Sequence, residues 1–408
     1  MTRRKPFSIL IEFVLTIVLF GCSGSVLPQS ETQSNECLSS TEKLAIPIHQ
    51  NDLTKLNQEE KFYPPLTWQA VANLPSPYIL SKLNFVMRSD NEIWLIASRT
   101  ETGSDAVLRY QIDQNQWDIF SSIDNIPAAP IGLISSPDGT IWGFGSFLQT
   151  MSVDKEDIAS LQTIPILSRY NQSKGQFEFV IDSGQLLKGE RLGSSSPVRF
   201  DSHGNLWMAM KDIEGQSEGM VLYRFDPATL QTKSYRIKEG KINFEDFIFD
   251  KDDTIWILDA QNGEILHYNQ ITGDYKNALL SGGNGFSKEE LTKAADLPLY
   301  LDREGRLWIS DLAWLDTQAP SDESAIKLYR VIRSTAFIDN VYLLWRRPYA
   351  ILESSNGLFW FSSAAGVVQL DPKTATWCRF TTADSNVIED GQKNLWMIAY
   401  NKIYRKSP

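Results

Sequence analysis

A short phrase occurs seven times in this 408-residue chain, and it constrains the fold more than any other feature. Each copy has a polar residue, often Asp, then a turn that often carries Gly, an aliphatic residue or Phe, and finally Trp. Repetition of this kind indicates a repeat architecture. The copies are RSDNEIW (88–94), SPDGTIW (136–142), DSHGNLW (201–207), DKDDTIW (250–256), DREGRLW (302–308), SSNGLFW (354–360) and DGQKNLW (390–396).

A second short segment follows each Trp. These segments alternate apolar and polar residues and contain β-branched or aromatic side chains, which is typical of half-buried strands. Asp-Pro turns lead from some of them into a further strand, and an apolar stretch precedes each Asp/Gly turn, so each unit is predicted to contain four strands. The segments are VLRY (107–110), LSRY (167–170), LYRF (222–225), LHYN (266–269), LYRV (328–331), VVQL (367–370) and KIYR (402–405).

The size of the units predicts the fold class. The repeated Trp residues lie 36 to 65 positions apart, and four-stranded units of this size are typical of β-propeller blades. We predict an all-β fold, a seven-bladed β-propeller of four-stranded antiparallel blades over residues 61–408. Because the last unit supplies only three strands, we expect an N-terminal strand, Leu66–Val71, to complete that blade and remove an open sheet edge.

The repeated Trp and Asp residues are interpreted as structural. A Trp at one fixed position in every blade is expected to pack between blades and bury a large apolar area. The Asp before each turn is expected to accept hydrogen bonds from local backbone N–H groups. The spacing lacks the density of ligands that a calcium loop needs, so we predict neither a metal nor a cofactor.

The N-terminus has the pattern of a targeting segment. Basic residues at 3–5 precede an apolar run over 7–20, and the sequence LFGC that ends at Cys22 resembles a bacterial lipobox. We predict a signal peptide over 1–21, lipidation of Cys22, and a flexible polar tether over 22–60. An uncleaved anchor and a soluble secreted protein are the alternatives. The expected location is the bacterial cell envelope, periplasmic or at the cell surface, with the lipid as the only membrane attachment.

Two further cysteines and the net charge bear on the chemistry outside the lipid anchor. Cys37 lies in the predicted tether and Cys378 on the predicted outermost strand of the sixth unit. An extracytoplasmic setting permits a disulfide between them; two unrelated thiols are the alternative. The net charge is −11, and no basic stripe follows the N-terminus, so nucleic acid is not expected as a partner.

The D-x-x-G-x-φ-W phrase, followed by φ-x-R-φ-D, resembles the repeat of two-component-regulator-type propellers. It is also similar to the repeat of streptogramin lyase-like propellers, and the resemblance covers roughly residues 66–405. The first family implies a periplasmic or surface sensor module. The second implies an enzyme that opens a cyclic ester by elimination, helped by His and a divalent metal. The three histidines, at positions 49, 203 and 267, lie in the tether, a turn and a strand, so they favour binding over catalysis.

Differences between the repeats locate a candidate binding face. Long insertions, among them 281–298, occur around units four to six and are expected to emerge on one face of the propeller. There, Asp259 and Asp311 follow equivalent strands and could bind a cation or an amine, or do acid–base work. Trp314, in the unit-five insertion, could stack on a sugar or on a side chain of a partner. The alternatives are solvated strand-end charges and a packed loop anchor.

Paired arginines on the same face suit recognition of an anion. Arg346 and Arg347 precede Tyr349, and arginines beside aromatic residues favour carboxylate or phosphate groups and partner contacts. Local salt bridges to Asp311 or Asp316 are the alternative.

No motif of a nucleophilic, metal or nucleotide-binding enzyme is present in the sequence. We therefore predict a non-enzymatic binding or scaffolding module whose partner is an envelope protein or a small extracellular ligand. The alternatives are a lyase or glycan-processing enzyme that uses carboxylates on the loop-bearing face, and an extracellular ligand sensor.

Overall fold

The computed structural model describes most of the chain from residue 68 onward and three short segments before it. These residues belong to one compact unit, Ser34–Pro408, and none of their helices is long and apolar enough to cross a membrane. The predicted signal peptide and Cys22 lie outside the described residues. Those residues are 36–40, 45–47, 58–61, 68–121, 124, 126, 129–150, 161–181, 190–191, 197–212, 220–237, 244–259, 264–279, 298–309, 313–316, 328–331, 348–363, 366–373, 376–381, 385–399 and 401–408.

Nearly all described secondary structure is β-strand, with one short 3-10 helix, η1 (Ser89–Asn91). Strands of the first half are β4 (Gln69–Asn73), β5 (Tyr78–Arg88), β6 (Glu92–Arg99), β7 (Asp105–Gln111), β8 (Gln116–Phe120), β9 (Ala129–Ser135), β10 (Ile141–Thr150), β11 (Leu161–Asn171), β12 (Gln176–Ile181), β13 (Glu190–Arg191), β14 (Val198–Phe200), β15 (Leu206–Asp212), β16 (Met220–Asp226) and β17 (Gln231–Tyr235). Strands of the second half are β18 (Phe244–Phe249), β19 (Ile255–Asp259), β20 (Glu264–Tyr268), β21 (Tyr275–Leu279), β22 (Leu299–Leu301), β23 (Arg306–Ile309), β24 (Ala313–Asp316), β25 (Leu328–Val331), β26 (Pro348–Glu353), β27 (Phe359–Ser363), β28 (Gly366–Asp371), β29 (Thr376–Thr381), β30 (Asn386–Glu389), β31 (Leu395–Ala399) and β32 (Lys402–Lys406).

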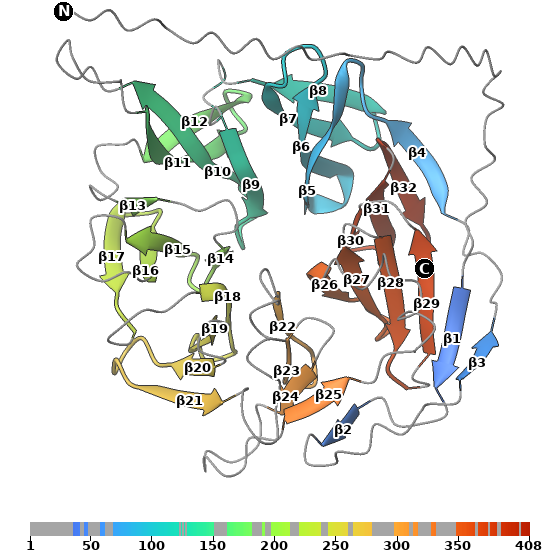
Figure 1. The fold of residues 1–408 in the computed structure, drawn as a ribbon. Coiled ribbons are helices and arrows are strands. Elements are labelled where there is room, and N and C mark those ends of the chain that lie inside the picture. The colour runs from blue at the N-terminus through green and yellow to red at the C-terminus, as the bar shows by residue number, and fades with distance from the viewer. Residues whose placement is uncertain are drawn as a thin grey trace, which may run out of the picture. The chain divides into compact units, whose positions relative to one another are not determined.

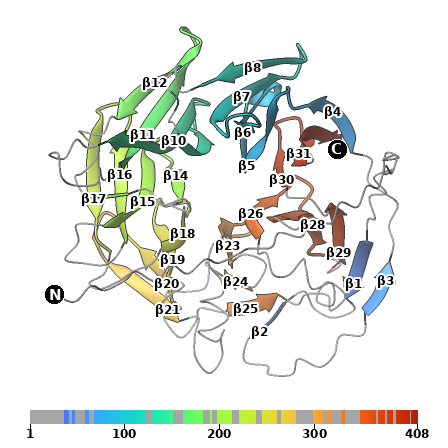
Figure 2. The ribbon, with the colours of Figure 1, turned by 45° about the horizontal axis from the view of Figure 1, so that its top comes forward.

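The described strands fall into seven antiparallel sheets, arranged as the blades of a β-propeller (Figure 1). Six sheets contain four consecutive strands each, and we number these blades one to six in chain order: β5–β8, β9–β12, β14–β17, β18–β21, β22–β25 and β26–β29. The first strands of the blades lie toward a common centre, which Figure 2 shows from a second angle. Four-stranded antiparallel blades were expected and are confirmed.

The last repeat forms a sheet of a different kind. It joins β30, β31 and β32 to β4, which comes from before blade one. The count of blades is therefore six instead of the expected seven, because only six sheets have four consecutive strands. Strand β4 spans Gln69–Asn73, a few residues later than the expected Leu66–Val71, and pairs with β32 through Ile403 opposite Ala72.

Neighbouring blades are joined by a repeated hydrogen bond. The second residue of an Asp/Gly turn donates its backbone N–H to a carboxylate of the next sheet. The backbone N–H of Gly391, in a turn of the last sheet, donates such a bond to Asp90, which follows β5. The same kind of bond therefore connects the last sheet to blade one. The bonds join Ser202 to Asp253 (3.1 Å), Arg303 to Glu353 (2.9 Å), Ser355 to Glu389 (2.8 Å) and Gly391 to Asp90 (2.7 Å).

The seven repeated Trp side chains lie in the core, as expected. They pack across blade boundaries: the Trp207 ring lies 5.6 Å from Phe249 of blade four, and the Trp308 ring lies 4.5 Å from Phe359 of blade six. Aromatic pairs at such distances add to the energy of apolar burial. The repeated Trp is therefore a contact between blades.

The repeated Asp has a second role besides its turn. In blade three, Asp201 is 4% exposed, accepts bonds from the backbone N–H groups of His203 and Asn205, and accepts a 2.9 Å bond from the Trp207 indole nitrogen. The carboxylate thus holds the turn and orients the ring at once. The corresponding indole bonds are 2.7 Å for Asp302 and Trp308 and 2.8 Å for Asp390 and Trp396.

Blade five differs from the sequence-based expectation. The segment LYRV (328–331) was expected as its third strand, but the third strand is β24 (Ala313–Asp316) and LYRV forms the outer strand β25. A connection of only three residues separates β23 from β24, and short hairpin connections are favoured over long ones. Trp314 therefore lies in a strand opposite Trp308 and not in an insertion.

Three short strands lie in the range expected to form the tether. They are β1 (Glu36–Ser40), β2 (Ala45–Pro47) and β3 (Gln58–Lys61). Strand β1 pairs with β29 of blade six, β3 pairs with β1, and β2 pairs with β25 of blade five. The range 22–60 is thus partly structured, because its strands add to the outer edges of two neighbouring blades.

Candidate functional site

Few of the residues proposed from the sequence can be placed. Asp259, at the end of β19, is 0% exposed and is therefore neither a solvated strand-end charge nor a surface ligand. Asp311, Arg346 and Arg347 lie outside the described residues, as do most of the long insertions that defined the expected face.

The backbone places two further candidates. Trp314 occupies the register position opposite the repeated Trp308, where most other units have Arg. Tyr349 lies at a β-bulge in β26, between Pro348 opposite Ser363 and Ala350 opposite Ser362. A bulge bends a strand locally and is often found beside functional sites. The described backbone does not bring these two residues and Asp259 together in one sheet.

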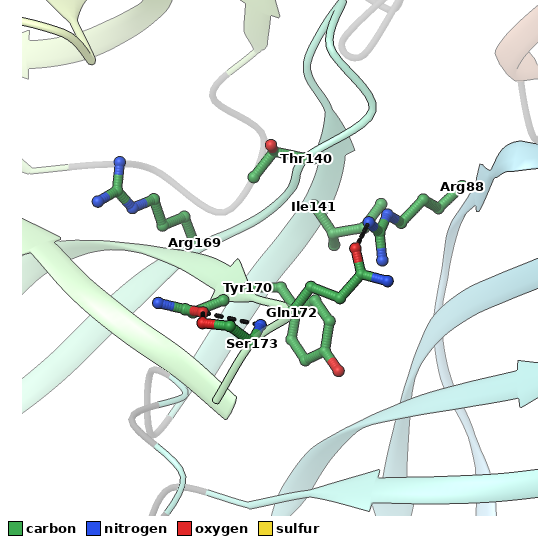
Figure 3. A pocket seen from close by; sticks show the side chains of 8 residues that line it. Arg88, Thr140, Ile141, Arg169, Tyr170, Gln172 and Ser173 are labelled. Atoms are coloured by element: carbon green, nitrogen blue, oxygen red, sulfur yellow. Dashed lines mark hydrogen bonds between the residues drawn. The ribbon is translucent and has the colours of Figure 1, made fainter. Parts of the chain in front are cut away.

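A polar pocket lies elsewhere, between blades one and two (Figure 3). Its volume is about 360 Å³. Blade one contributes Arg88 from the end of β5, and blade two contributes residues at the start of β10, at the end of β11 and in the turn that follows β11. The lining residues are Arg88, Thr140, Ile141, Arg169, Tyr170, Asn171, Gln172 and Ser173.

Arg88 is the residue that most distinguishes this pocket. It stands six positions before Trp94, where four other units have Asp and two have Ser. The indole nitrogen of Trp94 consequently bonds to Glu92, at 3.0 Å. Arg88 bonds across the blade boundary to Gln172, at 2.6 Å, and its ion pair with Glu92 is 3.5 Å long. Unit one has thus exchanged a structural carboxylate for a guanidinium that lines a pocket.

Arg169 departs from its repeat in a different way. Its register partner is Trp142, just as Arg109 is opposite Trp94. The Arg109 guanidinium carbon lies 5.3 Å from the Trp94 ring centroid, whereas no such cation–π contact to Trp142 is found for Arg169 among the described residues. The Arg169 side chain is 45% exposed, against 16% for Arg109, and its ion pair with Glu178 is 3.9 Å long. In Figure 3 it lies on the opposite side of the pocket from Arg88.

Unit two, which contains Arg169, also lacks the repeated Asp before its turn. Position 136 is Ser instead of Asp, and the indole nitrogen of Trp142 is buried without a hydrogen-bond partner. A carboxylate at position 136 would also have added a negative charge to the turn that carries Thr140. Units one and two, which border the pocket, are thus the one pair of neighbouring units that both lack the repeated Asp.

Tyr170, which lines the pocket, is held by contacts with blade one. Tyr170 is 6% exposed, its ring lies 4.7 Å from Trp94 of blade one, and its hydroxyl accepts a 3.0 Å bond from Arg109. Burial opposes the charge on Arg109, but its hydrogen bond to Asp118 and the nearby charges of Asp118 and Glu92 outweigh burial and raise the pKa of the guanidinium. Arg109 thus remains charged and fixes Tyr170 in place.

The charges of the pocket lining favour an anion, although each arginine also has a long ion pair with a glutamate outside the lining, Glu92 at 3.5 Å and Glu178 at 3.9 Å. Its described lining contains two arginines and no carboxylate, histidine or cysteine side chain, although the whole chain carries a net charge of −11. Guanidinium groups bind carboxylate and phosphate through paired charge-assisted hydrogen bonds. The hydroxyls of Thr140 and Ser173 and the amide of Gln172 could supply further donors.

The two histidines of the propeller are engaged separately. His267 stacks on Trp256 with 4.1 Å between ring centroids and bonds to Asp250 at 3.0 Å; it replaces the repeated Arg. His203 lies 2.9 Å from Asp253 at the boundary of blades three and four. Among the described residues no group of three or more His, Cys, Asp or Glu side chains could hold a metal ion.

The sequence contains a signal for this pocket in the first residue of the repeated phrase and not in the lengths of the insertions. Unit one begins its repeated phrase with Arg, and units two and six begin with Ser. Only units one and two are neighbouring exceptions, and the pocket forms at their boundary. The contact between Arg88 and Gln172 itself depends on how the blades pack.

Comparisons with solved structures agree with the fold. A catalytically inactive variant of virginiamycin B lyase from Staphylococcus aureus, solved with quinupristin, matches with a TM-score of 0.54 and 13% identity over 83% of this chain and 98% of that one. A streptogramin B lyase matches with a TM-score of 0.54 and 16% identity over 83% and 96%. No protein-family model and no curated protein matches the chain.

A third structure is an extracellular domain of a bacterial protein described as a hybrid two-component system, from B. thetaiotaomicron. It matches with a TM-score of 0.53 and 15% identity over 86% of this chain and 43% of that one, so this chain spans less than half of its length. At such identities the likeness concerns the fold alone, and a β-propeller can carry many functions.

Proposed function

We propose that this protein is a lipid-anchored, extracytoplasmic β-propeller that acts as a non-enzymatic binding module and holds a carboxylate group of its ligand between Arg88 and Arg169. The lipobox-like sequence before Cys22 supports the anchor, and the extracellular domain among the structural neighbours is consistent with the location.

One observation carries the proposal. At a single blade boundary, Arg88 replaces a structural Asp and Arg169 is largely released from its Trp, so that two guanidinium groups line a pocket without a carboxylate. Side chains that depart from a repeat no longer serve the packing that the repeat requires, and binding sites in repeat proteins concentrate at such departures.

Binding fits this pocket better than catalysis does. Acid–base or nucleophilic chemistry needs a titratable group within hydrogen-bond reach of the reacting atom. The described lining offers hydroxyl, amide and guanidinium groups, with no carboxylate or imidazole to act as a base. A lining with two guanidinium groups and a buried Tyr170 is suited to holding an anion.

Citrate, a small tricarboxylate, is the first probe, titrated calorimetrically into the full-length protein in detergent at low salt. Replacing Arg88 or Arg169 by Ala is expected to weaken citrate binding roughly tenfold or more, because a hydrogen bond to a charged group contributes about 1.5–3 kcal/mol. Raising the ionic strength should weaken binding in the wild type.

Arg99→Ala is the matched control for Arg169→Ala. The Arg99 side chain also comes from a strand, is 46% exposed and pairs with a glutamate, Glu101, at 3.1 Å, but it does not line the pocket. We expect its affinity for citrate to stay within about twofold of wild type. Equal losses in Arg99→Ala and Arg169→Ala, or no citrate binding by the wild type, would contradict the proposed site.

A photo-crosslinking residue in place of Ser173 distinguishes a protein partner from a small ligand. Ile271 occupies the equivalent turn position in blade four and is 88% exposed, so a crosslinker there is the control. In intact membranes, an envelope protein linked at position 173 and not at 271 would identify a protein partner. Citrate binding without such a product would indicate a small carboxylate.

A further inference from the structure

The outer edge of blade six is covered by strands from the N-terminal part of the chain. Strand β1 pairs antiparallel with β29, and β3 pairs with the other side of β1, so the sheet has six strands (Figure 1). Covering an exposed edge strand prevents unwanted pairing with other chains. Short added strands contribute few backbone hydrogen bonds, however, and gain stability when they are also held covalently.

The register of β1 places the two non-lipobox cysteines opposite each other. Cys37 is the partner of Cys378, between the pairs Glu36 with Arg379 and Leu38 with Trp377. Opposite Cα atoms in antiparallel strands lie about 4.5 or 5.5 Å apart, and both values fall within the disulfide range of about 4.4–6.8 Å. Positions that face each other across strands also share one face of the sheet.

The same row continues across the blade. Cys378 is opposite Gln369, and Gln369 is opposite Trp360, the repeated Trp of blade six. The register that pairs the cysteines is therefore continuous, strand by strand, with the register of the buried core. If β1 were shifted by one residue along β29, Cys378 would lie opposite Glu36 or Leu38. Cys37 would then belong to the opposite face of the sheet from Cys378.

We propose that Cys37 and Cys378 form a disulfide that fastens β1 to the outer edge of blade six. The formation of this bond in the cell rests on the extracytoplasmic location that we propose above, since structural disulfides persist in oxidising compartments. The bridge joins residues 341 positions apart and fastens the segment that leads back toward the lipid-bearing end.

The reaction is a thiol–disulfide exchange with an oxidised protein disulfide of the envelope. One cysteine thiolate attacks that disulfide and forms a mixed disulfide, releasing the first thiol of the oxidant. The second cysteine thiolate then attacks the mixed disulfide and releases the second thiol. The two cysteines lose two protons and two electrons in total, and the oxidant gains them as it is reduced to a dithiol.

The test is peptide mapping of the full-length protein from envelope membranes, unfolded with a thiol-blocking reagent and without reductant. We expect a linked pair of peptides that contain Cys37 and Cys378, which reductant separates. Limited proteolysis within 41–57 should be about tenfold faster or more in Cys378→Ser. Without the covalent link, β1 has a lower effective concentration at the edge of blade six and separates from it more often, which gives the protease access.

Shifted cysteines test the register itself. In a protein with Cys37→Ser and Cys378→Ser, adding Ser39→Cys and Thr376→Cys should restore a bridge, because these residues are also register partners. Combining Cys37→Ser with Leu38→Cys should give no bridge to Cys378, since the register partner of Leu38 is Trp377 and a step of one residue changes the face of a strand. All changes lie on an outer edge, so the propeller is expected to fold in each variant.

The outcomes separate this inference from the proposed location and binding site. Both thiols blocked in the envelope protein would overturn the disulfide in the cell. If oxidised glutathione then links Cys37 to Cys378 in the purified reduced protein, the register stands and the location is wrong. If glutathione does not link them either, the register is wrong. Citrate binding at Arg88 and Arg169 is independent of either result.

Discussion

Replacing Trp207 by Ala is expected to lower the free energy of unfolding by about 3–5 kcal/mol, the cost of removing a large aromatic side chain from a close-packed core. Trp207 is 0% exposed, its ring lies 4.9 Å from Tyr235 and 5.6 Å from Phe249, and its indole nitrogen bonds to Asp201. The substitution therefore leaves a cavity between blades three and four and a buried carboxylate with one donor fewer.

Urea unfolding followed by the fluorescence of the remaining Trp residues measures this effect. Trp117→Ala is the control, because Trp117 is only half-buried on the outer strand β8, where it packs on Tyr110 with 5.0 Å between ring centroids. We expect it to cost about 1–2 kcal/mol, in proportion to the smaller apolar area. Similar costs at positions 117 and 207 would contradict the role of the repeated Trp as the contact between blades.

Replacing Asp201 by Ala is expected to cost about 3 kcal/mol or more. The Asp201 carboxylate accepts bonds from the Trp207 indole and from both the backbone and side-chain nitrogens of Asn205. Asn205 and Trp207 are themselves buried, so their donors cannot all turn to water. A buried donor without a partner costs about 1–3 kcal/mol, and the substitution creates at least two.

Unit two supplies the natural control for Asp201→Ala. Ser136 stands at the equivalent position, and the Trp142 indole nitrogen already has no hydrogen-bond partner. Ser136→Ala removes an exposed bond to the Asp138 carboxylate and a partly buried 3.0 Å bond to the Thr140 carbonyl, and it should cost less than about 1 kcal/mol because one hydroxyl proton serves both acceptors. The difference between the two variants would be measured by chemical unfolding at neutral pH, and a difference near zero would mean that the carboxylate acts only on its turn.

Much of the fold followed from short-range pattern. The four strands of a blade and the use of Asp201 as a turn acceptor depend on residues within one unit, and the burial of the repeated Trp between blades follows from its recurrence at one position in every unit. Periodicity and turn chemistry report such local structure well. The same reasoning failed in blade five, where LYRV (328–331) matched the third-strand pattern although β24 takes that place.

The candidate site was much less predictable. Long insertions pointed to a face around Asp259, and Asp259 proved to be fully buried. The pocket instead depends on Arg88 from blade one and Arg169 and Gln172 from blade two, which are about 80 residues apart. The two neighbouring exceptions in the repeated phrase, Arg88 and Ser136, marked its position, but only the packing of the two blades brings the guanidinium groups to one cavity.

The amino-acid sequence by itself determined the blade: its four strands, its aromatic core and its turn carboxylates, because each of these depends on hydrogen bonds and side-chain spacing within a few tens of residues. The tertiary structure decided which distant segments meet. The pairing of β4 with β32, the pocket at Arg88 and the register of Cys37 with Cys378 join residues whose proximity arises only when the blades pack and the edge strands find their partners.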